Sequence, residues 1–352
     1  MRSSTSNSKN VFQRELPSSN LPMVVIGTFV LCVATLGIME YQIRKEGGLP
    51  SRALNISFWL NHRFKLDERP KNTTVLLGAS RMTFGLDQDT WEEETGTRPH
   101  NLGLHGASCI PMLHDYAKNT QGNGIVLCAL SGGFAFANER APFAERINHA
   151  IRDLDKHRYS LSLRSEDITG KLLQARIAVL NPRLYSPTSY VRDILRLPAR
   201  KNEIAWRHIP YAHHTEENQD VFINDIDDKY YWNQWDLLHA TPLRYMERFA
   251  PLDLDEAISL MKKDIKLIED RGGKVIFVRF PISRFFVEWE NTRFPREQYW
   301  DRILASTGCH GFHFLDHDET KDLSPLDGSH LLPEQARIFT KALARFVKDS
   351  DQ

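Results

Sequence analysis

Ser80, Asp327 and His330 are the side chains whose types and spacing best suit nucleophilic catalysis. Ser80 stands in a turn of small residues directly after an apolar run at 75–77. A serine hydroxyl becomes a good nucleophile only when a neighbouring base removes its proton. Asp327 and His330 are close in the chain, so the carboxylate can accept from one ring nitrogen and leave the other to face the serine. Together these residues predict a Ser-His-Asp catalytic triad.

The turn around Ser80 lacks the glycines of two common motifs. A dinucleotide-binding loop needs G-x-G-x-x-G, but Gly78 is followed by Ala79, Ser80 and Arg81. The nucleophile elbow of an α/β-hydrolase needs a glycine two residues after the serine, and Met82 stands there. The sequence therefore disfavours both a nucleotide site and an α/β-hydrolase elbow.

The elements around these residues follow an alternating pattern. Short apolar runs alternate with helical patterns, the runs at 75–77, 125–130 and 275–278 and the helical patterns at 253–270 and 333–347. Short, nearly continuous apolar runs are typical of strands covered by helices on both faces. The alternation predicts an α/β sandwich with a parallel sheet, in which ligands bind at the carboxyl ends of the strands. Ser80 would lie at such an end.

The N-terminal region carries an apolar segment without a charge at residues 21–39. A helix needs about 20 apolar residues to cross a bilayer, whereas the apolar core of a signal peptide has about 7–15. We expect a polar tail at 1–20, a transmembrane anchor at 21–41 and a single-pass membrane protein. Basic residues lie on both sides of the segment, so their distribution does not select an orientation. The short tail and the large domain that follows suit a signal anchor with its domain outside the cytoplasm, in the periplasm or on the cell surface.

The rest of the chain divides into a linker and a domain. Residues 42–72 are polar and are expected to link the anchor to a domain at 73–350, so that a soluble form could begin near Asn72. An insertion at about 140–250 breaks the alternation, with helical stretches at 141–156 and 172–180. His213 and His214 within it are expected to lie in a solvated loop.

The composition excludes several classes of function. Lys and Arg total 45, as do Asp and Glu, so no net charge would attract nucleic acid. The four cysteines are Cys32, Cys109, Cys128 and Cys309, and they form no C-x-x-C pair. We expect no metal site, no cofactor and no disulfide framework.

The residues around the predicted triad resemble the SGNH/GDSL hydrolase superfamily, and more closely its membrane-anchored branch that modifies bacterial envelope polysaccharides and teichoic acids. Gly78-Ala79-Ser80 is similar to the first sequence block of that superfamily, and Asp327-Gly-Ser-His330 is similar to the last, D-x-x-H. The stretch from Asn101 to Ser108, NLGLHGAS, is similar to the second block. The resemblance covers roughly residues 73–135 and 250–348.

The resemblance implies a three-layer α/β/α sandwich of flavodoxin-like type and a site without a cofactor. It makes Ser80 the nucleophile, His330 the base and Asp327 its partner, with the backbone N–H groups of Ser80 and Gly106 as the oxyanion hole. The third block, normally G-x-N-D, is not present, because the chain reads Ser131-Gly-Gly-Phe after the run at 125–130. The loss of one oxyanion donor typically lowers turnover by about 10²–10³-fold.

The implied function is that of an esterase or O-acyltransferase, with acetyl as the expected group and an envelope glycan as substrate. Its expected partners are the membrane and other polysaccharide-modifying membrane proteins. The alternative is an anchored glycan-binding or scaffold protein that keeps the fold with a decayed site. Intact Ser80, Asp327 and His330 favour the enzyme, and the absent third block favours the alternative.

Six further residues are candidate substrate contacts. Arg81 follows the predicted nucleophile and Arg279 ends a late strand, where each could balance an anionic substrate. Asn101 begins the second block. Aromatic rings stack on sugar faces, and the insertion supplies Tyr231, Trp232 and Trp235.

Overall fold

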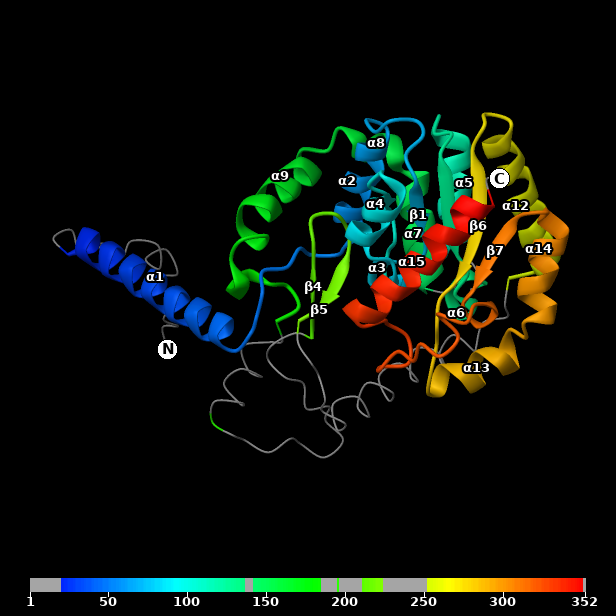
Figure 1. The fold of residues 1–352 in the computed structure, drawn as a ribbon. Helices are drawn as coiled ribbons and strands as arrows, with labels where there is room; N and C mark the ends of the chain where they lie inside the picture. The colour runs from blue at the N-terminus through cyan, green and yellow to red at the C-terminus, as the bar shows by residue number, and fades with distance from the viewer. Residues whose placement is uncertain (1–19, 137–141, 185–194, 196–210, 224–251, 351–352) are drawn as a thin grey trace, which may run out of the picture.

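A computed structural model describes residues 20–136, 142–184, 195, 211–223 and 252–350 (Figure 1). The chain is an α/β protein built on one parallel sheet of five strands, in the order β2-β1-β3-β6-β7. The strands are β1 (Val75–Leu77), β2 (His100–Asn101), β3 (Ile125–Ala129), β6 (Lys274–Arg279) and β7 (His310–His313). The prediction of an α/β fold with a parallel sheet is confirmed, and all three expected strands are present.

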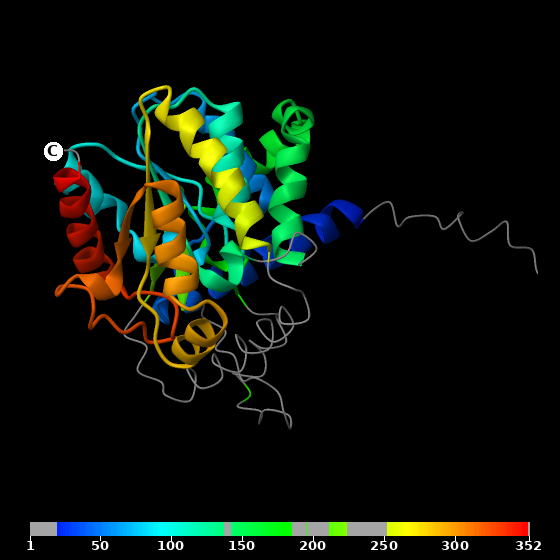
Figure 2. The ribbon, with the colours of Figure 1, turned by 90° about the vertical axis from the view of Figure 1, so that its right-hand side faces the viewer.

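Helices cover both faces of this sheet (Figure 2). One face carries α3 (Ser80–Gly85), α4 (Gln88–Thr95) and α15 (Pro333–Asp349), which pack on one another. The other face carries α5 (Cys109–Asn119), α7 (Pro142–Arg152), α12 (Leu254–Glu269) and α14 (Arg302–Thr307). The remaining short helices in this part of the chain are α6 (Gly132–Ala135), α13 (Phe285–Arg293), η4 (Glu297–Asp301) and η5 (Phe314–Asp316).

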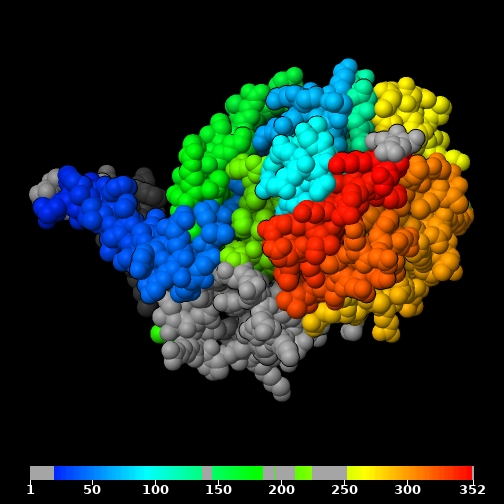
Figure 3. Space-filling view, viewed as in Figure 1, coloured from blue at the N-terminus to red at the C-terminus, as the bar shows by residue number. Residues whose placement is uncertain are grey.

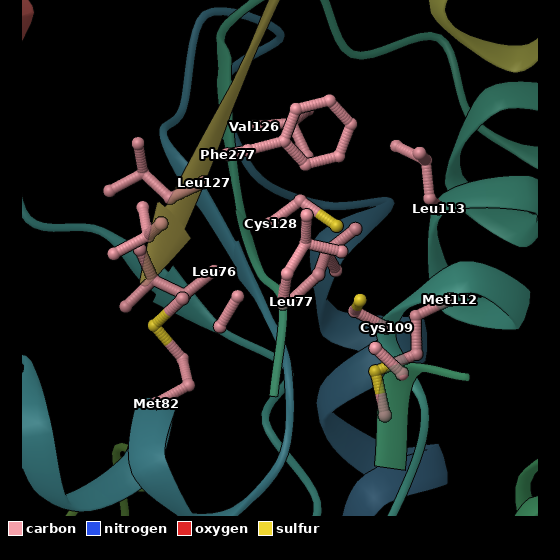
Figure 4. Close-up of a cluster of buried hydrophobic side chains, with 14 of the residues drawn as sticks. Leu76, Leu77, Met82, Cys109, Met112, Leu113, Val126, Leu127, Cys128 and Phe277 are labelled. Carbon is pink, nitrogen blue, oxygen red and sulfur yellow. The ribbon is translucent and has the colours of Figure 1, made fainter. Parts of the chain in front are cut away.

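The sheet and α5 enclose the centre of the hydrophobic core (Figure 4). Leu76, Leu77 and Val126 are inaccessible to solvent. Leu77 lies on the side of the sheet that faces Cys109 and Met112 of α5, whereas Leu76 lies on the opposite side near Met82 (Figure 4). A strand buried on both faces has no solvent side on which to place polar residues, which is why the runs in the sequence are nearly continuous. The apolar stripe of α12 is buried in the same core, and Asp253 caps that helix by accepting from two backbone N–H groups.

The segment at 42–72 is not a linker, and the prediction is wrong there. Its residues 56–66 form α2 (Ile56–Leu66), which Asn55 caps by accepting from the N–H of Phe58 at 2.9 Å. Trp59 is fully buried, and its indole N–H donates to the carbonyl oxygen of Leu102 at 2.9 Å. The sequence did not predict this helix, because polar residues interrupt its apolar pattern. One of them, Arg63, is buried in an ion pair with Asp115. The globular part of the chain therefore begins before α2.

The described part of the insertion forms a helical arc and a hairpin. The arc consists of α7, α8 (Leu154–Arg158), α9 (Leu161–Thr169), η2 (Gly170–Gln174) and η3 (Ala178–Leu180), and the hairpin consists of the antiparallel strands β4 (Ala212–His214) and β5 (Asp220–Phe222). The solvated loop predicted for His213 and His214 is wrong, because both residues lie in β4 and His214 is buried. The rings of Phe58 and His214 pack edge to face with their centroids 5.1 Å apart, and the Asp220 carboxylate lies 3.1 Å from His214 Nδ1.

The helix α1 (Leu21–Lys45) projects from the body of the molecule (Figures 1 and 3). Among the described residues it is the one helix long and apolar enough to cross a membrane, with a mean hydropathy of 2.4 over its most apolar window. Its apolar side chains are exposed, whereas Ile43 near its end is buried against the insertion.

The position of α2 in the core predicts where a soluble form can begin. A chain that starts at Leu49 keeps α2 and should elute as a folded protein with cooperative thermal unfolding. A chain that starts at Asn72 loses Trp59 and Leu60 from the core and should aggregate, because removal of one large buried side chain already costs about 3–5 kcal/mol. Size-exclusion chromatography and circular dichroism of the two forms would check this, and equal stability of both forms would contradict it.

Candidate active site

Ser80 occupies the turn between β1 and α3. It is the first residue of α3, and Ala79 before it is extended, so the chain changes from strand to helix within one residue. Gly78 makes this turn possible, because a Cβ at that position would lie only 2.8 Å from the Cβ of Ala129 on the neighbouring strand. Ser80 is half-buried, which leaves its hydroxyl at the carboxyl end of β1.

The structure brings Ser80, His330 and Asp327 into one hydrogen-bonded chain. His330 Nε2 lies 2.8 Å from Ser80 Oγ, and His330 Nδ1 lies 2.6 Å from Asp327 Oδ2. The fully buried carboxylate of Asp327 can only accept, so Nδ1 carries the proton and Nε2 is left to accept from the serine hydroxyl. This is the arrangement in which a histidine acts as base toward a serine.

The loop that carries His330 is held by its own backbone. Asp327 Oδ1 accepts from the N–H groups of Ser329 at 2.9 Å and His330 at 2.7 Å. Gly328 has φ of +87°, which favours glycine, and a Cβ there would lie 3.0 Å from the Phe286 ring. One carboxylate therefore shapes the turn with one oxygen and orients the imidazole with the other.

The loop after β2 brings Gly106 to the same edge of the sheet. The N–H of Leu104 donates to the carbonyl oxygen of Gly78 at 2.9 Å, which ties this loop to the turn before Ser80. Gly106 has φ of +70°, a conformation that side chains rarely adopt. Phe84 packs beside both regions, with its ring centroid 4.4 Å from that of His330 and 5.9 Å from that of His105.

The hairpin β4–β5 clamps this loop through two side chains that the sequence did not single out. Asn218 Nδ2 donates to the carbonyl oxygens of Asn101 and Gly103, each at 2.9 Å. Asp220 is fully buried and accepts from His105 Nε2 at 2.6 Å. Burial lowers the pKa of His105 to about 4 although the Asp220 carboxylate opposes this shift. No motif marks Asn218 or Asp220, because they lie far from the loop in sequence.

The candidate substrate contact Asn101 is buried within this arrangement. Its Oδ1 accepts from the N–H of Gly103 at 2.8 Å, and 1% of the residue is exposed. Asn101 therefore shapes the loop and does not face a substrate. Tyr231, Trp232 and Trp235 lie outside the described residues.

Arg81 and Arg279 belong to one ion cluster, in which Arg81 is buried and Arg279 is partly buried. A protein carboxylate balances both charges, which argues against their predicted role of balancing an anionic substrate. Arg81 Nη2 lies 2.6 Å from Glu290 Oε1, and Arg279 pairs with the other oxygen of the same carboxylate. Arg81 Nε also donates to Ser329 Oγ at 3.1 Å, next to His330. Arg81 and Glu290 are about 2–3% exposed, so the charge of Arg81 is balanced inside the protein.

Glu290 was not predicted from the sequence, although it joins the turn after β1 to the end of β6. Burial alone would raise its pKa, but Arg279 and Arg81 outweigh burial and hold the pKa at about 2. A carboxylate with two arginine partners remains charged at any physiological pH. Its position in α13 follows no recognisable motif.

The segment after β3 has no asparagine at the position of the third block. Ser131 to Phe136 turn into the short helix α6, and the carbonyl oxygen of Ser131 accepts from the N–H of Ala135 at 2.7 Å. Gly132 is required there, because a Cβ would lie 2.8 Å from the Phe294 ring. This segment therefore fills the space beside α13 and supplies no amide side chain.

A cavity of about 280 Å³ lies beside the carboxyl ends of β3, β6 and β7. Aromatic rings of Phe294, Tyr299 and Trp300 line it together with Arg279. Neither Ser80 nor His330 lines this cavity, so it is a separate feature of the same edge of the sheet. Among the described residues, no three His, Cys, Asp or Glu side chains converge as a metal ion would require.

No protein-family model matches the chain, and a search of the curated proteins finds no relative. The case for a function therefore depends on the geometry of these residues.

The buried ion cluster predicts how stability depends on pH. The folded-state pKa of Glu290, about 2, lies below the ordinary value of about 4.3, so its charge stabilises the folded state above about pH 4.3. That contribution is lost as the pH falls toward 2. Replacement Glu290→Gln leaves two arginines without a counter-charge and should lower the free energy of unfolding by about 3 kcal/mol at pH 7.

Urea unfolding of the form that begins at Leu49 would measure this difference between pH 7 and pH 3. The difference between parent and variant should shrink as the pH falls. Glu288→Gln, an exposed change on the same helix, should stay near the parent. A Glu290→Gln effect that stays constant over this range would contradict the assignment.

Proposed function

We propose that this chain is a membrane-anchored serine esterase or O-acyltransferase of the SGNH/GDSL type, acting on an acyl ester of an envelope glycan. The main support for this proposal is the continuous hydrogen-bonded chain Ser80–His330–Asp327, with heavy-atom distances of 2.8 and 2.6 Å. Residues far apart in the sequence meet in the order and geometry that a nucleophile, its base and an orienting carboxylate need.

The proposed reaction has two steps. Ser80 Oγ attacks the carbonyl carbon of the ester while His330 Nε2 takes the hydroxyl proton, and the ester oxygen leaves with that proton. A water or a sugar hydroxyl then attacks the acyl-Ser80 ester and gives its proton to His330, which passes a proton to Ser80 Oγ as the acyl–oxygen bond breaks, so that the free serine and neutral histidine are restored. The N–H groups of Ser80 and Gly106 are the proposed donors to the oxyanion in both steps.

The family assignment is supported by the placement of the sequence blocks. Ser80 follows β1, the NLGLHGAS segment follows β2, and Asp327 and His330 precede the last helix. Helices on both faces of the parallel sheet suit the three-layer sandwich of that superfamily. The lack of a third-block asparagine favours the alternative of a decayed glycan-binding or scaffold protein, whereas the intact triad favours catalysis.

The proposed location is the membrane, with α1 as a single span and the domain outside the cytoplasm. The support is the exposed apolar surface of α1 and the absence of charge over residues 21–39. A neighbouring membrane protein that delivers the acyl group is the proposed partner for a transfer reaction.

The first test asks whether the three residues act as a unit. Ser80→Ala, His330→Ala and the double variant should lose nearly the same activity on a chromogenic acetyl ester, because members of a triad are not additive. Asp327→Asn should keep a larger remainder. Rates should be measured with and without a glycan acceptor, with product sugars identified by mass spectrometry.

A covalent probe separates the enzyme from the decayed scaffold. A fluorophosphonate should add one mass equivalent to the parent and to Ser165→Ala, an exposed serine on α9, but not to Ser80→Ala. A parent chain that neither reacts with the probe nor cleaves any ester while remaining folded would favour the scaffold.

Asn218 provides a test of the loop that carries Gly106. Asn218 has φ of +62°, so Asn218→Gly keeps the backbone conformation while it removes the buried amide and its two hydrogen bonds. If these bonds position an oxyanion donor, kcat should fall by about tenfold or more while KM stays near the parent value, since that donor acts mainly in the transition state. An unchanged kcat in a folded variant would show that the clamp serves stability alone.

A further inference from the structure

A stripe of apolar side chains is exposed on the arc of the insertion. Leu161, Ile168 and Leu172 are 78%, 57% and 53% exposed and lie on α9 and η2. Their spacing of seven and four residues places them on one face of a helix. The opposite side is anchored in the domain, because Leu163 is buried in the main core. We call these three residues the α9–η2 stripe.

The end of α1 is fixed next to this arc. The carboxylate of Glu40 accepts from the backbone N–H groups of Ala178 at 3.0 Å and Val179 at 2.7 Å, at the start of η3. Arg44 Nη2 donates to the carbonyl oxygen of Arg176 at 2.7 Å. Glu40 follows the apolar segment directly, so no flexible linker separates a membrane-spanning α1 from η3.

The direction of α1 sets where a membrane would lie. Figure 1 shows α9 running across the direction of α1, on the side of the molecule from which α1 leaves. In Figure 3 the end of α1 adjoins this part of the insertion, whereas the rest of α1 projects away from the body. Transmembrane helices tilt by about 20° on average from the bilayer normal, so a bilayer around α1 would meet α9 along its length.

We propose that the α9–η2 stripe lies in the interfacial region of the same membrane that α1 crosses. This rests on the proposed span of α1. The exposed side chain of Arg164 lies within the stripe, and that of Arg176 lies at the foot of α1, where both can contact anionic lipid headgroups. An amphipathic helix with an apolar face and basic residues is the ordinary form of an interfacial membrane contact. The anchored domain is thereby held in one orientation and does not tumble on its anchor.

A second copy of the chain is the other occupant that such a stripe could bind. Single exposed apolar residues are common on protein surfaces. The three residues of the α9–η2 stripe differ, because they share one helix face and lie on the side of the molecule from which the apolar helix α1 leaves (Figure 1). The bilayer is favoured because the fixed foot of α1 brings it to this face in every molecule. An experiment can separate these occupants.

Spin labels on the full chain in vesicles of phosphatidylethanolamine and phosphatidylglycerol would test the contact. Labels at Ile168→Cys, Val30→Cys and Leu267→Cys, in a Cys32→Ser/Cys309→Ser background, compare the stripe, α1 and an exposed leucine on α12. The label at 168 should be accessible to oxygen and protected from a water-soluble nickel complex, as at 30 and unlike at 267. When Leu161→Gln and Leu172→Gln are added, the oxygen and nickel accessibilities of the label at 168 should move toward those of the label at 267.

Each result decides a different point. Equal nickel accessibility at 168 and 267, with lipid values at 30, overturns the interfacial contact while α1 still spans the membrane. Protection of 168 from both oxygen and nickel indicates a second protein copy and also overturns it. If the label at 30 is accessible to nickel as in water, α1 does not span the membrane, and the interfacial contact is rejected as well. The esterase proposal is tested separately by the reaction of Ser80 with the fluorophosphonate.

Discussion

The parallel alignment of the strands is the constraint on which the candidate site depends. Because β1, β2, β3, β6 and β7 all run in one direction, the segments that follow them meet at one edge of the sheet. Ser80 follows β1, the loop of Gly106 follows β2, and the loop of His330 comes after β7. An antiparallel arrangement of the same strands would separate these segments to opposite edges. Strand direction thus brings together a serine and a histidine from opposite ends of the chain.

Buried ionic contacts hold together the two segments that the sheet brings to the site. The Ser80 turn and the His330 loop share a support, because Arg81 pairs with Glu290 and also donates to Ser329. Removing one member of a buried charge cluster leaves the others unbalanced in a medium of low polarity. Arg81 and Ser329, which neighbour Ser80 and His330 in the chain, are therefore held in place by an ion cluster that lies behind the candidate active site.

The sequence predicts three of the five strands of the sheet, the helices at 253–270 and 333–347 and the triad candidates, because each carries a local signal of period or spacing. The short strands β2 and β7 carry no such apolar run and were not predicted. It fails where a polar residue is buried with a distant partner. Arg63 and Arg81 look exposed in the sequence, yet Asp115 and Glu290 neutralise them in the interior. Likewise His214 looks solvated until its partner Asp220 is known. The two residues of such a pair lie on different segments of the chain, and no local sequence pattern shows that these segments will meet.

The insertion connects the two proposed functions of the chain, anchoring and catalysis. Arg52 lies between α1 and α2, and its guanidinium pairs with Asp167 of α9 at 3.4 Å and with Glu216 beside β4 at 2.9 Å. The same hairpin places Asn218 against the loop of Gly106, while η3 binds the foot of α1. Polar contacts, partly buried at the foot of α1 and fully buried at the loop of Gly106, therefore link the insertion both to the end of α1 and to the candidate oxyanion loop. Since buried hydrogen bonds and ion pairs fix geometry more tightly than solvated ones, these contacts hold the candidate site in a defined position relative to α1, and so relative to the membrane that α1 is proposed to cross.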